Sequence, residues 1–100
     1  MYVKNGIAYA GEEKPVLSIG GVRPLDGHKL WVRFNTGEAK VYDFTPLLGK
    51  AAFAALSDER VFRGVYLDYG VPVWQNGEID IAPEELYRGG VPADQMTAVL

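Results

Sequence analysis

The sequence predicts an α+β fold, a small and mainly antiparallel sheet built from hairpins with short helices packed on it. Three observations lead to this fold class. Strand and turn signals dominate the chain, and two Asn-Gly pairs lie between short apolar segments. The strand segments also do not alternate singly with helices, which disfavours a Rossmann-like parallel sheet.

A chain of 100 residues is near the usual size of one domain. We expect the domain to span residues 1–88, with an N-terminal hairpin over 1–10 and a core over about 15–87. Little apolar periodicity remains in residues 89–100, so a tail outside the main fold is predicted there. The formal charge is −3 and the sequence contains no basic run, so no direct contact with nucleic acid is expected.

Cysteine is absent, which excludes disulfides, thiolate metal ligands and cysteine nucleophiles. Its absence favours the reducing cytoplasm. Residues 1–20 contain four charged side chains and no sustained apolar run. Neither a signal peptide nor a membrane span is therefore predicted, and we expect a cytoplasmic protein.

The N-terminal elements follow from turn chemistry. Asn5-Gly6 predicts a type I′ hairpin over residues 2–9. A second strand is expected over 16–23, bulged at Gly20-Gly21, and is followed by a turn over 24–27.

The clearest strand pair covers residues 29–35 and 38–44, where side chains alternate with period two. An even loop pairs Val32 with Val41 and keeps apolar residues on one face, whereas an odd loop would pair Val32 with Lys40. We therefore predict the even register. Its pairs are Phe34 with Ala39, Val32 with Val41, Arg33 with Lys40, and Trp31 with Tyr42.

Short helices are predicted between the two strand-rich parts of the chain. Thr45-Pro46 is typical of an N-cap followed by proline at the first helical position. A second short helix is expected over 51–56. Ser57 then caps a third over 58–63, which ends at Gly64.

Strands return after Gly64, over residues 65–69, 71–75 and 78–81, with Asn76-Gly77 as a second type I′ turn. Pro83 begins a last helix with two acids in its first turn, and Gly89-Gly90 ends it. The apolar spacing predicts one core, consisting of Leu30, Val32, Phe34, Val41, Phe53, Leu56 and Phe62.

Several of these segments carry a family resemblance by their order and spacing, over about residues 15–87. They resemble a bacterial domain of unknown function, number 2442 in the common family numbering, and the resemblance implies a small α+β fold. The segments are Val22-Arg23-Pro24-Leu25, Leu30-Trp31-Val32-Arg33-Phe34, Gly37-Glu38, Asp43-Phe44-Thr45-Pro46-Leu47-Leu48, Phe53-Ala54-Ala55-Leu56-Ser57-Asp58, Phe62, Val73-Trp74-Gln75-Asn76-Gly77 and Asp80-Ile81-Ala82-Pro83-Glu84-Glu85-Leu86-Tyr87.

The resemblance also implies two kinds of partnership. Some relatives carry a DNA-binding helix-turn-helix after this domain, and others are encoded beside a small protein in arrangements similar to toxin–antitoxin pairs. Only thirteen residues follow Tyr87, so we expect no helix-turn-helix here. Gln75 stands where many relatives have proline, and the N-terminal hairpin is added, so the choice of partner can differ.

No catalytic residue, metal site or cofactor is predicted. The one histidine, His28, lies in a predicted turn without a triad motif and is expected to be solvated. An alternative acid site, for a small enzyme or a ligand- or cation-binding domain, would use Asp43, Asp68 and Asp80 at strand ends. Helix-start hydrogen bonds explain Asp43 and Asp80 more simply. Trp74 is expected to pack in the core rather than stack on a ligand.

The leading functional hypothesis is a module that binds itself or a small protein partner. The even register gathers Trp31, Arg33, Lys40 and Tyr42 on one face of the central hairpin. Trp, Tyr and Arg are enriched at the centres of interfaces. An acidic surface, for example Glu84 and Glu85 of a second copy, would relieve the Arg33–Lys40 repulsion.

Overall fold

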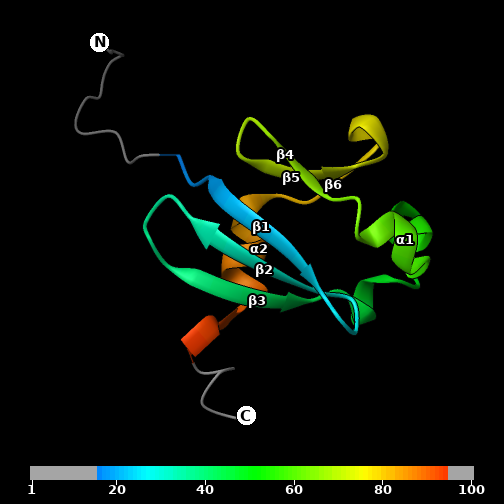
Figure 1. Ribbon diagram of the computed structural model, residues 1–100, viewed down its shortest axis with the longest axis horizontal. Coiled ribbons are helices and arrows are strands. Elements are labelled where there is room, and N and C mark those ends of the chain that lie inside the picture. Colours follow the sequence, from blue (N-terminus) through cyan, green and yellow to red (C-terminus); the bar gives the residue numbers. More distant parts are fainter. Residues whose placement is uncertain (1–15, 95–100) are drawn as a thin grey trace.

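The computed structural model describes residues 16–94, which form two small antiparallel sheets with short helices (Figure 1). This is the expected α+β fold. The predicted hairpin over residues 2–9 lies outside the described residues. The four-stranded sheet has the order β1 (Ile19–Leu25), β2 (Lys29–Phe34), β3 (Ala39–Asp43), β7 (Val91–Pro92), and the three-stranded sheet has the order β4 (Tyr66–Asp68), β5 (Val71–Trp74), β6 (Ile79–Asp80).

Strand β1 forms one edge of the four-stranded sheet and contains the expected bulge. The pairing with β2 shifts between Ile19 and Gly21, which leaves Gly20 as the extra residue. Pro24 is tolerated inside this strand because an edge strand has one side without a pairing partner.

The predicted even register between β2 and β3 is wrong. Val32 pairs with Lys40, and Trp31 pairs with Val41. The connecting loop has three residues and closes with two backbone hydrogen bonds, from Gly37 N–H to the Phe34 carbonyl and from Phe34 N–H to the Glu38 carbonyl. Gly37 has a φ of 95°, the conformation that ends a type I turn in a three-residue hairpin loop.

This register determines which side chains share a face. Leu30, Val32 and Phe34 lie on the same side as Lys40 and Tyr42, and α2 (Pro83–Gly89) covers that side. Val41 lies on the opposite side, with Trp31. The assignment of Val41 to the main core is therefore wrong, although its side chain is only 7% exposed.

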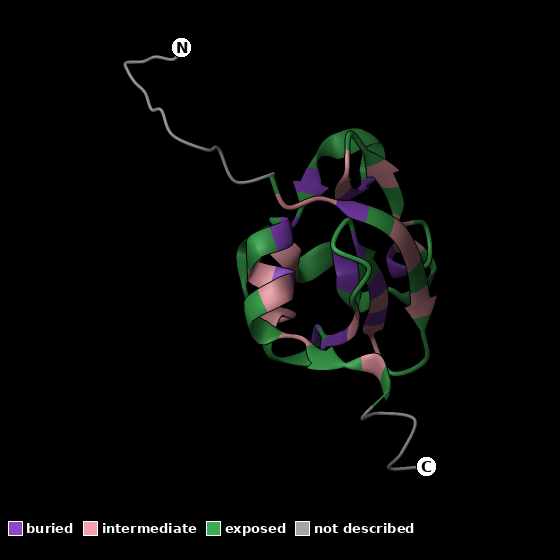
Figure 2. Ribbon diagram, turned by 90° about the vertical axis from the view of Figure 1, so that its left-hand side faces the viewer, coloured by how far each residue is buried: buried purple, intermediate pink, exposed green. Residues whose placement is uncertain are grey.

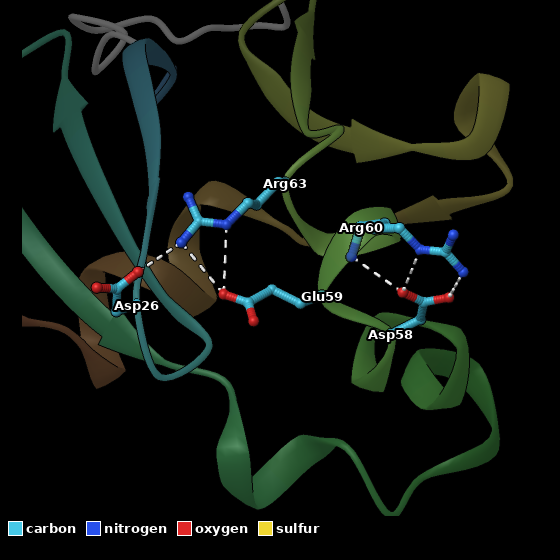
Figure 3. A network of polar contacts seen from close by, with 5 residues as sticks. All are labelled: Asp26, Asp58, Glu59, Arg60 and Arg63. Carbon is cyan, nitrogen blue, oxygen red and sulfur yellow. Dashed lines mark hydrogen bonds and ion pairs between the residues drawn. The ribbon is translucent and has the colours of Figure 1, made fainter.

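Three short helical segments connect the sheets: η1 (Thr45–Leu47), η2 (Ala51–Ser57) and α1 (Glu59–Phe62). Thr45 is the first residue of η1 rather than its cap, and Asp43 accepts the Thr45 N–H at 2.9 Å. Likewise Asp58, not Ser57, caps α1 by accepting the Arg60 N–H (Figure 3). In both places a carboxylate is the stronger acceptor for the free N–H groups of a helix start.

Arg63, at the end of α1, joins that helix to the turn between β1 and β2. Its guanidinium contacts Glu59 at 3.1 Å and Asp26 at 2.5 Å (Figure 3). All three side chains are exposed, so each ion pair contributes at most about 1 kcal/mol. A single guanidinium thus bridges two carboxylates at this end of the molecule.

The two hairpins of the three-stranded sheet have different loops. Tyr69 and Gly70 connect β4 to β5 with φ values of 50° and 80°, as in a two-residue type I′ turn. The predicted two-residue turn at Asn76-Gly77 is wrong, because Trp74 pairs with Ile79 and four residues lie between them. Gln75, in the segment η3 (Gln75–Gly77), has a φ of 53°, which proline cannot adopt.

Helix α2 begins at Pro83, as expected, but the chain after it does not leave the fold. Val91 and Pro92 form β7, which pairs with Val41 and Lys40 of β3. The prediction of a tail outside the main fold is therefore wrong for these two residues. Gly90 permits the close approach, because a Cβ there would lie 2.7 Å from the Leu86 carbonyl oxygen and 3.0 Å from the Lys40 Cβ.

The main core lies where the two sheets, α1 and α2 contribute buried residues, whose ribbon is purple in Figure 2. Trp74 is fully buried there and donates its Nε1–H to the Phe62 carbonyl at 2.8 Å, so the expected packing role is confirmed. No helix within residues 16–94 is long and apolar enough to cross a membrane. The buried core consists of Ile19, Leu30, Val32, Phe34, Tyr42, Phe44, Leu56, Phe62, Trp74, Ile79, Ile81 and Leu86, with Phe53 packed at its margin.

Candidate functional site

The outer face of the four-stranded sheet is the side opposite α2, and no described helix covers it (Figure 1). One row of side chains crosses all four strands on this face, because Arg23 pairs with Trp31, Trp31 with Val41, and Val41 with Val91. We call this surface the Trp31 face. It consists of Arg23, Leu25, Lys29, Trp31, Arg33, Ala39, Val41, Asp43 and Val91, so Asp43 is its one acid, opposite Lys29.

Two guanidinium groups flank the indole at the centre of the Trp31 face. The Cζ atoms of Arg23 and Arg33 lie 5.8 and 5.5 Å from the Trp31 ring centroid, within cation–π distance. Gly21 lies beside the ring, where a Cβ would be in ordinary van der Waals contact with Trp31 Cζ3 at 3.5 Å. The contacts hold a tryptophan and two cations in one group.

One shallow hollow lies on the Trp31 face, and a second lies at its edge. The first, of about 390 Å³, is lined by Arg23, Leu25, Trp31 and Arg33. The second has a similar volume, and its lining joins Lys29, Asp43 and Val91 of the Trp31 face to Tyr42 and Gly89 of the α2 side. Neither hollow is an enclosed pocket of the kind that surrounds a small substrate. The open shape of this surface therefore favours contact with the surface of another protein.

The predicted cluster of Trp31, Arg33, Lys40 and Tyr42 is divided between the two sides of the sheet. Lys40 lies under α2, where its Nζ donates to the Tyr87 carbonyl at 2.6 Å. The Tyr42 hydroxyl donates to Glu85 on the same helix at 3.0 Å. These two residues hold α2 in place, while Trp31 and Arg33 remain on the outer face.

Arg23 is the member of the group that sequence reasoning missed. Its alternation with Val22 and Pro24 was visible in the sequence, but its place beside Trp31 follows from the pairing of β1 with β2. The bulge at Gly20 was expected, but the sequence pattern does not reveal which strand pairs with β1, and that pairing places Arg23 beside Trp31.

The three acids of the alternative site lie on two different sheets. Asp43 is at the end of β3, whereas Asp68 and Asp80 are on β4 and β6, the two strands that flank β5. Within residues 16–94 there is no cluster of three acidic or histidine side chains that could hold a metal ion. The hydrogen bond from the Thr45 N–H keeps the pKa of Asp43 below its usual value, consistent with the structural role.

His28 is not the solvated turn residue that the sequence predicts. It lies in the turn with a φ of 60°, but its ring packs on Phe62 with the centroids 5.3 Å apart. Its Nε2 is buried and has no hydrogen-bond partner among the described residues. The ring therefore packs on Phe62, and an electrostatic interaction also links His28 to Asp43.

Tyr42 provides a test of how α2 is held. Burial, followed by the hydrogen bond to Glu85, raises the pKa of Tyr42 from 10.0 to about 12. A raised pKa means that the folded state favours the neutral phenol, so this stabilisation is complete below pH 10 and is lost as the pH rises through about 12. We expect unfolding midpoints to fall over that range, and to fall less in Tyr42→Phe. Denaturant titrations at a series of pH values test this, and equal slopes for the two proteins would contradict it.

Together these features define a small α+β protein with two antiparallel sheets, an outer sheet face with one tryptophan beside two arginines, and no assembled acid cluster in its described residues. Residues 19–92 match the family model described as protein of unknown function (DUF2442). The chain belongs to this family, as the resemblance implied. Comparisons with curated proteins and with solved structures found no match.

Proposed function

We propose that this protein is a protein-binding module that docks an acidic, partly apolar surface of another protein chain onto the Trp31 face. The observation that carries the proposal is the placement of Trp31 between Arg23 and Arg33 on a sheet face without a helix. Tryptophan and arginine dominate the residues that contribute most to binding at protein interfaces.

The charges of the Trp31 face support an acidic partner. Neither Arg23 nor Arg33 has an ion-pair partner within residues 16–94, whereas Arg60 and Arg63 are paired with acids. A carboxylate surface would complement the unpaired guanidinium groups and speed the encounter. The simpler alternative is that Trp31 and its two arginines only stabilise the sheet by their mutual contacts.

The partner that the family resemblance implies is a second small protein, as in a toxin–antitoxin-like pair. The cysteine-free sequence makes the cytoplasm the compartment in which to seek it. An enzyme that uses Asp43, Asp68 and Asp80 is the weaker hypothesis, since these residues are on separate sheets.

Binding measurements on Trp31→Ala test the proposal. The immobilised wild-type protein is first used to capture binding partners, either from source lysate or as purified copies of itself. These partners should bind Trp31→Ala about 30-fold more weakly, because an interface hot spot contributes about 2 kcal/mol or more. Lys50→Glu, at an exposed position near η2, is the control and should bind normally.

Circular dichroism must show that Trp31→Ala is folded. We expect it to be, since Trp31 is not part of the main core. Raising the salt concentration should also weaken wild-type binding. If folded Trp31→Ala retains every chain with wild-type affinity, the proposal is wrong.

A further inference from the structure

The three-stranded sheet has an acidic outer face. Tyr66 pairs with Val73 and Val73 pairs with Asp80, so these three side chains form one row on the side opposite Trp74. Asp68 lies on the same side, two residues after Tyr66 in β4. We call this surface the Asp80 face. It consists of Tyr66, Asp68, Val73 and Asp80.

The acids of the Asp80 face are not neutralised within the described part of the chain. Asp68 and Asp80 are exposed and form no ion pair with any residue of 16–94, whereas Asp26, Asp58 and Glu59 are all paired with arginine. Tyr66 is 44% exposed beside them. The Asp80 face therefore joins free carboxylates to an aromatic ring.

The Asp80 face and the Trp31 face are complementary in charge and similar in construction. Each has a valine of an inner strand, Val73 or Val41, buried between its cross-strand neighbours. Each places an aromatic side chain next to that valine, Tyr66 on one face and Trp31 on the other. The net charges of the two faces are opposite in sign. The Asp80 face has two aspartates, whereas the Trp31 face has Arg23, Arg33 and Lys29 against the single acid Asp43.

We propose that the occupant of the Trp31 face is the Asp80 face of a second copy of this chain. This inference rests on the proposed function and names the partner. Because the two surfaces are different, the contact is heterologous, and repeated contacts build either a closed ring or an open chain of copies. The net charge of −3 opposes association of whole molecules, so the attraction is local and sensitive to salt.

Charge reversal on each face tests this pairing by sedimentation equilibrium of the purified chain. The variant Arg23→Glu with Arg33→Glu has two acidic faces, and the variant Asp68→Lys with Asp80→Lys has two basic faces. Each alone should associate at least about tenfold more weakly than the wild type, because like charges in a contact cost several kcal/mol. Asp94→Lys changes an exposed acid after β7 in the same direction and should associate normally.

Mixing the two charge-reversed variants gives the decisive result. The acidic and basic faces are complementary again in the mixture, so association should return to within about threefold of the wild type. Association that is lost in each variant and restored in the mixture also shows that both variants are folded.

Two results would overturn the inference. One is a wild-type chain that remains monomeric up to about 1 mM, the weak limit of specific association. The other is self-association that the Asp68→Lys, Asp80→Lys variant retains. With either result, Trp31→Ala could still fail to bind a different protein that the wild type binds. The Trp31 face would then bind that protein, and the proposed function would stand without self-association. Binding of a single-stranded oligonucleotide that the arginine reversals abolish would instead assign the face to nucleic acid.

Discussion

Replacing Phe62 by alanine is expected to lower the free energy of unfolding by about 3 to 5 kcal/mol. The Phe62 ring is fully buried, stacks on Trp74 with centroids 6.1 Å apart, and meets Phe44 edge-on at 5.5 Å. Truncation leaves a cavity at the junction of α1 with the two sheets. Such a loss is a large part of the stability of a small domain.

Phe53→Ala is the matched control for Phe62→Ala. Phe53 is partly buried at the margin of the same core and meets Phe44 at 6.2 Å, so its truncation should cost less. Urea denaturation followed by tryptophan fluorescence measures both variants. Equal midpoints for the two, or an unchanged midpoint in Phe62→Ala, would show that Phe62 is not at the centre of the core.

Gly70→Ala should have the second large effect, about 2 to 3 kcal/mol of lost stability. Gly70 has a φ of 80°, and a Cβ there would lie 2.7 Å from the Ser18 Cβ. The Gly70 carbonyl oxygen also accepts a hydrogen bond from the Ile19 N–H, with 2.8 Å between nitrogen and oxygen. The β4–β5 turn therefore packs directly on the start of β1. A side chain at Gly70 must separate the two sheets or strain the turn.

Gly77→Ala separates these two causes. Gly77 has a similar φ of 88°, but a Cβ there would have no neighbour within 4 Å. It should lose only the backbone contribution, about 1 kcal/mol. Thermal denaturation of both variants gives the difference between them, which is the cost of the contact with Ser18. If Gly77→Ala is as unstable as Gly70→Ala, the close contact between the sheets contributes nothing.

Local chemistry was sufficient to predict most of the elements. The bulge at Gly20, the start of α2 at Pro83 and the β2–β3 hairpin all depend on neighbouring residues, and each was predicted. The burial of Trp74 was expected as well, because a large aromatic between strand residues gains most by packing. The family resemblance pointed to the same α+β fold, and the family match confirms the family.

Only half of the candidate site was predicted, because its composition depends on whether the β2–β3 loop has an even or an odd number of residues. Trp31 and Arg33 were named from the sequence, but the three-residue loop ending at Gly37 pairs Trp31 with Val41 instead of Tyr42. A shift of one residue sends Lys40 and Tyr42 to the opposite face. Alternation alone does not reveal such a shift, since both registers keep the pattern within each strand.

The sequence by itself thus determined where most of the strands, turns and helices form, because those choices are made by residues close together in the chain. Only the tertiary structure decided which strands share a sheet. The return of Val91–Pro92 to β3 and the packing of Gly70 on Ser18 join segments that are about fifty residues apart. Long-range contacts of this kind depend on which surfaces fit each other, and they set which side chains form the Trp31 face and the Asp80 face.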